Sequence, residues 1–149
     1  MRAVIQRVNH ASVEVDNKII SKIDKGLLVL LGVEESDENS DLIYMADKVS
    51  GLRIFEDSNE KMNLSVKDIS GEVLVVSQFT LLGDCKKGKR PSFKKAMEPS
   101  KAEEMYLSFC KEMKNYDLVI KEGQFGADMK VSLENDGPVT IMIDSRKTF

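Results

Sequence analysis

One short segment combines residue types that can stabilise a developing negative charge. Ser77-Gln78-Phe79-Thr80-Leu81 places hydroxyl and amide side chains directly after the apolar run Val73–Val76. Where a buried strand ends, its backbone N–H groups lose their partners in the sheet and become free to donate to an oxyanion. The alternative interpretation is an ordinary hydroxyl-rich turn, because such turns are common at strand ends.

Side-chain catalysis has few candidates in this chain. Thr80 has a hydroxyl that could act as a nucleophile, but a threonine hydroxyl is weak without a neighbouring base. The sequence has one histidine, His10, and no G-x-S-x-G motif that would present a serine to it. We therefore expect any chemistry to proceed without a conventional side-chain base.

A second segment, Asn135-Asp136-Gly137-Pro138-Val139-Thr140, places a proline directly after typical turn residues. Alternating strand patterns flank it at Met129–Glu134 and Val139–Asp144, so the sequence predicts a hairpin turn at Asn135–Gly137. A proline at the head of a strand removes a ladder donor and permits a cis Gly–Pro bond. Such a turn is either a functional tip or a plain hairpin whose second strand begins with proline.

A basic loop follows the first segment, with six cationic residues and no acid after Asp84. Its cations are Lys86, Lys87, Lys89, Arg90, Lys94 and Lys95. Because the whole chain has a net charge of −3, only a local patch of this kind could attract a polyanion. The alternative interpretation of these cations is a solvated surface loop without a partner. Gly83–Lys89 matches the start of a phosphate-binding P-loop, but Arg90 occupies the position that needs Ser or Thr, which argues against nucleotide binding.

Length and composition limit the class of protein. The chain has 149 residues, 42% of them hydrophobic and 32% charged, which predicts one globular domain over residues 1–149. Its longest apolar run, Leu27–Val33, is too short for a bilayer, and the N-terminus has no signal-peptide pattern. We therefore expect a cytoplasmic protein without membrane contact and with reduced thiols. Two cysteines and one histidine are too few for a structural zinc site, so we expect no metal and no cofactor.

Strand patterns dominate the elements that must position these segments. The expected strands are Val4–Val8, Ala11–Val15, Lys18–Ile23, Leu27–Val33, Val73–Val76, Met129–Glu134 and Val139–Asp144. One helix is expected to begin at Ser36 as its N-cap, with Asp37 and Glu38 in the first turn. A second follows Pro99, with a capping box at Ser100–Glu103 and an inert Cys110 in its buried stripe. The predicted fold class is mixed α/β: a predominantly antiparallel sheet curled into a partial barrel, with two main outer helices.

The segments Ser77–Leu81 and Asn135–Thr140 resemble the two signature motifs of the D-aminoacyl-tRNA deacylase family. The resemblance covers essentially the whole chain and implies the fold of that family. It extends to the segments Arg7-Val8, Ala11–Val13, Gly26–Val33, Ser50–Phe55, Lys61–Asn63, Gly88, Arg90–Phe93, Phe125–Ala127 and Met129.

This resemblance implies a homodimer that hydrolyses the ester between a D-amino acid, or mischarged glycine, and the terminal adenosine of tRNA. The active sites would lie at the subunit interface. Gly137-Pro138 would be a Gly-cisPro motif, held by Arg7, that enters the partner subunit's pocket and excludes L-amino acids. The pocket itself would be lined by Ser77, Gln78, Phe79, Thr80, Phe125 and Met129. We expect the basic loop to contact the tRNA acceptor end through Lys86, Lys87, Lys89 and Arg90.

An aminoacyl ester is already activated, so its hydrolysis needs little beyond a bound oxyanion and an oriented water. We expect the backbone N–H groups of Gln78, Phe79 and Thr80 to bind the oxyanion, and the 2′-hydroxyl of the terminal ribose to assist; the Thr80 side chain is the alternative. Three other functions stay open: a non-catalytic RNA-binding module, an esterase that cleaves small esters through Thr80, and a purely structural dimer.

Overall fold

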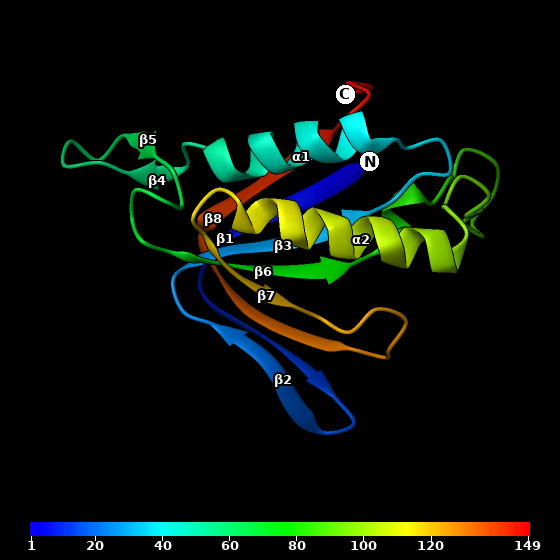
Figure 1. Cartoon of the computed structure of the whole chain (residues 1–149), viewed down its shortest axis with the longest axis horizontal. Coiled ribbons are helices and arrows are strands. Elements are labelled where there is room, and N and C mark those ends of the chain that lie inside the picture. The colour runs from blue at the N-terminus through cyan, green and yellow to red at the C-terminus, as the bar shows by residue number, and fades with distance from the viewer.

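The computed structural model describes all 149 residues, and its sheet is organised around one long strand, β1 (Arg2–Val15). This strand pairs antiparallel with β2 (Lys18–Ile23), β3 (Gly26–Gly32) and β8 (Lys130–Asp144). The first half of β1 lies between β3 and β8, and its second half lies between β2 and β8 (Figure 1). Because β1 changes one of its neighbours halfway along, the sheet curls on itself.

Two parallel strands extend the sheet beyond β3. They are β6 (Glu72–Ser77), which pairs with β3, and β7 (Val119–Glu122), which pairs with β6. The sheet therefore has the order β2-β1-β3-β6-β7, with β8 also on β1. Three of its pairings are antiparallel and two are parallel.

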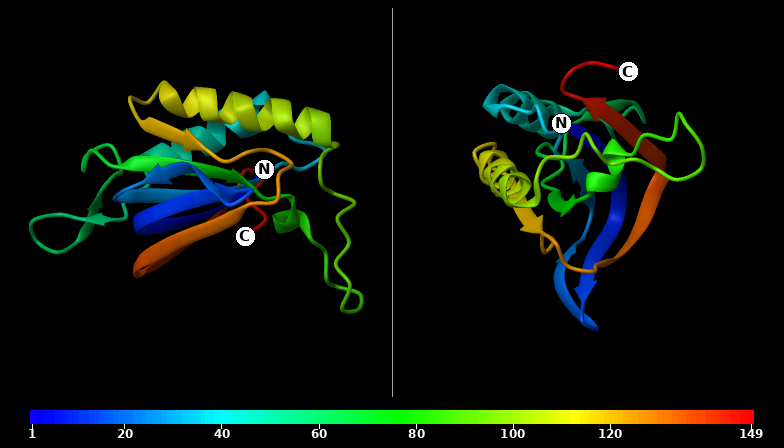
Figure 2. Two further views of the ribbon diagram at one scale, coloured as in Figure 1. Left: turned by 90° about the horizontal axis from the view of Figure 1, so that it is seen from below. Right: turned by 90° about the vertical axis from the view of Figure 1, so that its right-hand side faces the viewer.

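Two helices, α1 (Asn39–Gly51) and α2 (Pro99–Lys114), lie side by side over one face of this sheet (Figures 1 and 2). A small separate sheet pairs β4 (Phe55–Glu56) with β5 (Met62–Leu64). The predicted fold class, a mixed α/β fold with a barrel-like sheet and two outer helices, is confirmed. Neither helix is long and apolar enough to cross a membrane.

Alternate residues of β3 enter two hydrophobic cores, which explains its continuous apolar sequence. Leu27, Val29 and Leu31 pack under the helices, whereas Leu28 belongs to a smaller core inside the curl of the sheet. Cys110 lies fully buried in the larger core, where desolvation raises the pKa of its thiol to about 12. The prediction that Cys110 is buried in the core is confirmed, and a buried thiol with a raised pKa is expected to be unreactive.

The predicted hairpin at Asn135–Gly137 is wrong, because β8 continues through this segment as a partner of β1. Asn135 lies opposite Val8 and Thr140 lies opposite Gln6, so four residues of β8 bulge out against one residue of β1. The Asn135 side chain supports the bulge: its amide nitrogen donates to the Val139 carbonyl at 3.2 Å, and its oxygen accepts from the Val139 N–H at 2.8 Å. These two bonds replace ladder bonds that the bulge breaks.

The start of the first helix also differs from the prediction. Helix α1 begins at Asn39 with Glu38 as its N-cap, and Asp41 completes the capping box. Asp37 is not in the first turn because its buried carboxylate accepts from the Met1 ammonium at 2.5 Å and from the Glu34 N–H at 2.6 Å. A carboxylate with two such donors holds the chain away from helical geometry at this point.

The predicted capping box of the second helix, Ser100–Glu103, is likewise wrong, because the N-cap lies two residues earlier. Glu98 is the N-cap of α2, Pro99 is the first helical residue, and the Glu98 carboxylate accepts from the N–H groups of Ser100 and Lys101. Proline is well suited to the first helical position, where its missing N–H costs nothing.

Candidate active site

A cavity of about 620 Å³ opens where β6 ends, between the start of α2 and the loop that leads into β8. Phe79, the first residue of the short 3-10 helix η1 (Phe79–Leu82), lines it. The cavity has the size and mainly apolar lining of a small-molecule site. Its lining comprises Val76, Ser77, Gln78, Phe79, Phe93, Ala96, Met97, Glu98, Pro99, Ala102, Phe125, Gly126, Ala127, Met129 and Val131. We call it the β6 pocket.

The structure brings five of the predicted site residues together in this pocket: Ser77, Gln78, Phe79, Phe125 and Met129. The first three end β6 and begin η1, whereas the other two come from the loop between β7 and β8. These segments meet because β6 and β7 run parallel, so the chain leaves both strands at the same edge of the sheet.

The backbone donors at the end of β6 are not all free. The Gln78 N–H donates to the Leu31 carbonyl at 2.7 Å, which removes it from the predicted set of oxyanion donors. The first N–H bonded within η1 is that of Leu81, which donates to the Gln78 carbonyl at 3.3 Å. The N–H groups of Phe79 and Thr80 precede it at the start of the helix, where N–H groups have no partner within the helix.

Thr80 lies outside the pocket lining, and its side chain is exposed. Its hydroxyl oxygen accepts a hydrogen bond from the Gln78 amide nitrogen. No acidic or histidine side chain bonds to it; the one histidine, His10, is paired at 3.6 Å with Glu134. No general base is therefore bonded to the Thr80 hydroxyl.

Aromatic and sulfur contacts set the shape of the β6 pocket. Phe79 and Phe93 meet edge to face with centroids 5.1 Å apart, and Phe125 packs against Tyr106 at 5.9 Å. The Met129 sulfur accepts from the Gln124 N–H at 3.4 Å, which fixes the loop that closes the pocket.

Glu98 is the only charged side chain that lines the pocket, and the sequence analysis missed it. Hydrogen bonds from the Ser100 hydroxyl and the N–H groups of Ser100 and Lys101 lower the pKa of its carboxyl, so it is ionised at neutral pH. The role of Glu98 as the N-cap could have been predicted from Pro99, because a proline at the first helical position makes the preceding residue the N-cap.

Gly137 and Pro138 form the exposed tip of the β8 bulge, and the peptide bond between them is cis. Gly137 has a φ of 128°, and a Cβ at this position would lie 2.7 Å from the Val139 side chain and 3.0 Å from the Arg7 guanidinium. Only glycine fits this conformation and this close approach without rearrangement.

Arg7 holds the bulge from the β1 side and is only 5% exposed. Its Nη1 donates to the Ile54 carbonyl at 2.7 Å, and its Nε donates to the Asp136 carbonyl at 3.1 Å and lies 3.2 Å from the Asp136 carboxylate. The guanidinium thus ties the bulge to the chain that follows α1.

The bulge and the β6 pocket lie toward opposite ends of β3. Arg7 pairs with Leu27, whereas the Leu31 carbonyl bonds to Gln78. Four residues of strand separate these points, about 13 Å at 3.3 Å per residue. Gly137-Pro138 therefore does not reach the β6 pocket of its own chain.

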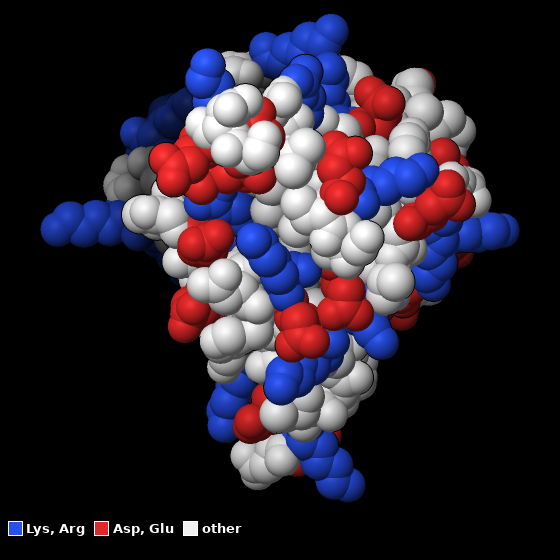
Figure 3. Space-filling view, turned by 90° about the vertical axis from the view of Figure 1, so that its left-hand side faces the viewer, with Lys and Arg blue, Asp and Glu red and all other residues white.

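The basic loop leaves the molecule as a narrow projection, which appears in light green in the left view of Figure 2. Its two ends are joined by reciprocal backbone bonds between Asp84 and Ser92, at 2.8 and 3.0 Å. The side chains of Lys86, Lys87, Lys89 and Arg90 are all exposed, and none forms an ion pair. By contrast, the face seen in Figure 3 mixes acidic and basic side chains without a field of one sign.

Comparisons with known proteins agree on one family. The family model described as D-Tyr-tRNA(Tyr) deacylase matches residues 4–144. A D-aminoacyl-tRNA deacylase of Thermosipho africanus is 56% identical over 149 residues, and one of Clostridioides difficile is 57% identical; each alignment covers 100% of both chains.

Two solved structures share the fold. The c-Myc DNA Unwinding Element Binding Protein has a TM-score of 0.91 and 44% identity, with 97% of this chain and 98% of the other covered. A probable eukaryotic D-amino acid tRNA deacylase has a TM-score of 0.81 and 19% identity, with 95% and 97% covered.

Proposed function

Because this chain belongs to the D-Tyr-tRNA(Tyr) deacylase family, whose curated relatives are D-aminoacyl-tRNA deacylases, we propose that it hydrolyses D-aminoacyl-tRNA in a site completed by a second copy of the chain. One observation carries the proposal: the pocket at the end of β6 and the rigid Gly137-Pro138 tip are separate in one chain. A homodimer brings one tip to each pocket.

The proposed chemistry relies on backbone groups and on the substrate. The free N–H groups of Phe79 and Thr80 stabilise the oxyanion that forms when water attacks the ester carbonyl. The attacking water loses a proton and the departing ribose oxygen gains one. The 2′-hydroxyl of the terminal ribose, next to the ester oxygen, assists this transfer. The ester is already activated, and positioning alone is worth several kcal/mol, so the site needs no side-chain base.

Chiral selection in this proposal comes from the partner subunit's bulge. Gly137 and Pro138 are exposed in the single chain and held by Arg7 and Asn135, which makes them a rigid projection that is available to a neighbour. Their carbonyls face the substrate Cα and exclude the side chain of an L-amino acid by steric conflict. Glycine has no side chain to exclude, so we expect slow hydrolysis of glycyl-tRNA.

A deacylation assay on matched D- and L-aminoacyl-tRNA tests the activity. We expect hydrolysis of the D-form and rejection of the L-form. Binding of tRNA without hydrolysis would instead identify an RNA-binding module, and rapid cleavage of a free amino acid ester without RNA would identify an ordinary esterase.

Mixed dimers test the contribution of the partner subunit. Gly137→Ala breaks the excluding wall, whereas Phe79→Pro removes one oxyanion donor and inactivates the pocket. In a dimer of one Gly137→Ala chain and one Phe79→Pro chain, the intact pocket of the Gly137→Ala chain receives the intact tip of the Phe79→Pro chain. Adding the inactive Phe79→Pro chain should therefore suppress the L-activity of Gly137→Ala; an unchanged L-activity would contradict selection across subunits.

A further inference from the structure

A second hollow, of about 370 Å³, lies at the other end of η1 from the β6 pocket, where Leu82 and Gly83 line it. It is lined by Arg2, Leu82, Gly83, Asp84, Cys85, Lys86 and Lys95. Three of these residues are cationic and one, Asp84, is acidic; two further carboxylates contact the cations, because Arg2 pairs with Asp144 and Lys95 approaches Glu34. The lining itself is mainly basic in a chain with a net charge of −3. We call it the Arg2 pocket.

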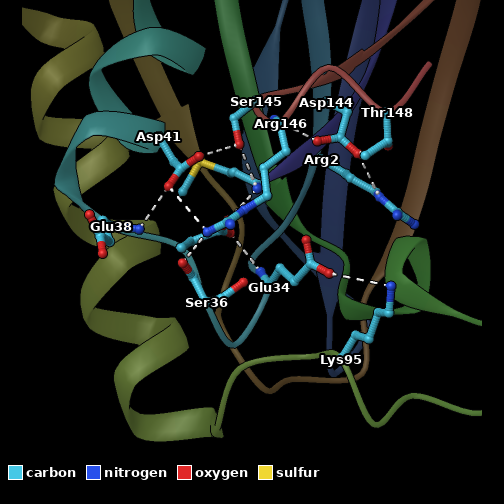
Figure 4. A network of polar contacts seen from close by, with 12 residues as sticks. Arg2, Glu34, Ser36, Glu38, Asp41, Lys95, Asp144, Ser145, Arg146 and Thr148 are labelled. Atoms are coloured by element: carbon cyan, nitrogen blue, oxygen red, sulfur yellow. Dashed lines mark hydrogen bonds and ion pairs between the residues drawn. The ribbon is translucent and has the colours of Figure 1, made fainter.

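The cations of the Arg2 pocket come from β1 and from the two ends of the basic loop. Arg2 on β1 is oriented by Asp144 and by the Leu81 carbonyl, each 3.2 Å away, and these contacts leave its Nη2 without a partner. Lys95 approaches Glu34 at 3.9 Å but is 61% exposed, so it is free to reach into the hollow. Figure 4 shows Arg2 and Lys95 on the same side of the polar network, next to η1.

Lys86 enters from the basic loop. Its backbone N–H donates to the Asp84 carboxylate at 2.9 Å, which fixes the turn from which its side chain leaves. Asp84 thereby uses an acceptor on the loop itself, and the lysine ammonium has no ion pair in the chain. Each of the three cations therefore retains hydrogen-bonding capacity for an anion.

The Arg2 pocket and the β6 pocket share a wall. Phe93 lines the β6 pocket and also packs on Gly83 of the Arg2 pocket, where an added Cβ would lie 3.0 Å from its ring. Phe79 and Gly83, one in each pocket, are joined by η1, and four residues of 3-10 helix span about 8 Å. One strand of a nucleic acid helix advances about 3.4 Å along the axis per nucleotide, so the two pockets lie within a few nucleotides of each other.

We infer that the Arg2 pocket binds a phosphate of the RNA strand whose 3′ end occupies the β6 pocket. This inference rests on the proposed function, because it takes the substrate in the β6 pocket to be an aminoacyl-tRNA. A free guanidinium N–H and two ammonium groups match the several acceptor oxygens of a phosphate. The phosphate anchors the strand and sets how far its end enters the catalytic pocket.

Chemically altered RNA tests the inference. The substrate is a D-aminoacylated acceptor-stem minihelix that carries a neutral methylphosphonate at each of the last three linkages in turn. We expect the methylphosphonate at one of these linkages to raise the KM of the unmodified protein roughly 10-fold, because it removes one charged hydrogen bond. The double variant Lys86→Ala/Lys95→Ala loses two of the three cations but keeps Arg2, so its response to the same linkage should be smaller, about threefold. Equal responses in both proteins would overturn the inference.

Two controls separate the possible sources of the effect. Lys87→Ala/Lys89→Ala removes the same charge from the same loop outside the Arg2 pocket, so it should keep the full response to the altered linkage. A minihelix without its 5′-phosphate distinguishes a terminal phosphate from an internal phosphodiester: sensitivity only to the 5′-phosphate would overturn the assignment to the 3′ strand.

Cys85 supplies a readout that does not depend on catalysis. It is an exposed thiol in the lining of the Arg2 pocket, whereas Cys110 is buried and serves as an internal control. We expect saturating minihelix RNA to slow the alkylation of Cys85 by iodoacetamide roughly 10-fold. This threshold equals the change expected in KM. Unchanged alkylation would overturn the inference even in an active enzyme, whereas protection without deacylation would support it and contradict the proposed catalytic function.

Discussion

Arg7→Ala is the substitution that best tests how the bulge in β8 is held. It deletes a buried guanidinium that joins the Ile54 carbonyl to the Asp136 carbonyl and carboxylate. The Ile54 carbonyl would lose a donor at 2.7 Å in a buried position, and the bulge would lose its contact with β1.

The magnitude follows from these contacts. A hydrogen bond with a charged donor contributes about 1.5–3 kcal/mol, and a buried acceptor left alone costs about 1–3 kcal/mol. Since part of the cost is recovered when water enters the site, we expect a net loss of about 3 kcal/mol in the free energy of unfolding. For a chain of this size that loss lowers Tm by about 6–12 °C.

Arg53→Ala is the matched control, because Arg53 also donates to a backbone carbonyl, that of Asn63 at 2.9 Å, but on the exposed surface. We expect it to change stability by less than about 0.5 kcal/mol. Urea titration measures both variants, and deacylation of D- and L-aminoacyl-tRNA measures selectivity. If Arg7→Ala is as stable and as selective as Arg53→Ala, Arg7 does not hold the bulge and the reasoning is refuted.

Three further predictions concern individual residues. Thr80→Ala should keep kcat within about tenfold of the original, because the backbone donors survive; a loss of about four orders of magnitude, or a trapped acyl-threonine, would restore Thr80 as the nucleophile. Gly137→Ala should cost on the order of 1–3 kcal/mol of stability and admit L-substrates, since its φ of 128° and the nearby Val139 leave no room for a Cβ. Its control, Gly51→Ala, meets no atom within 4 Å and should be neutral or slightly stabilising in thermal melts. For Asp144, burial alone would raise the pKa, but hydrogen bonds from Thr148, Arg146 and Arg2 hold it below the ordinary 3.8. Its stabilising contribution is therefore complete above pH 3.8 and is lost as the pH falls through the lowered pKa, and Asp144→Asn should flatten that part of the pH dependence of the urea midpoint.

The strands and the pocket segment were predictable because they depend on local patterns. Leu27–Val33 is apolar on both faces, and the structure buries both faces of β3. Ser77–Thr80 lies where a buried strand ends, and three of its residues line a cavity. In both cases the sequence carries the information within a few neighbouring residues.

Two of the errors arose where a distant contact decides the local structure. Asp37 satisfies the N-terminal pattern of a helix, but the Met1 ammonium, 36 residues away in sequence, binds its carboxylate. Asn135–Gly137 has the residues of a hairpin turn, but β1 pairs with the chain on both sides of it and keeps β8 continuous. No window of neighbouring residues contains either partner.

The continuity of β8 explains why a bulge, rather than a hairpin, suits the proposed role. A hairpin tip is held by its two strands alone, and it moves when they twist. The tip at Gly137-Pro138 is flanked on both sides by residues paired with β1, and Arg7 and Asn135 bond to its base. A wall that distinguishes enantiomers must keep its position within a fraction of a bond length, since the two substrates differ only in which direction a side chain leaves Cα. In the proposed site, backbone carbonyls in such a frame would exclude one direction without reading the identity of the side chain, so we expect it to accept D-amino acids with different side chains and to hydrolyse glycyl-tRNA slowly.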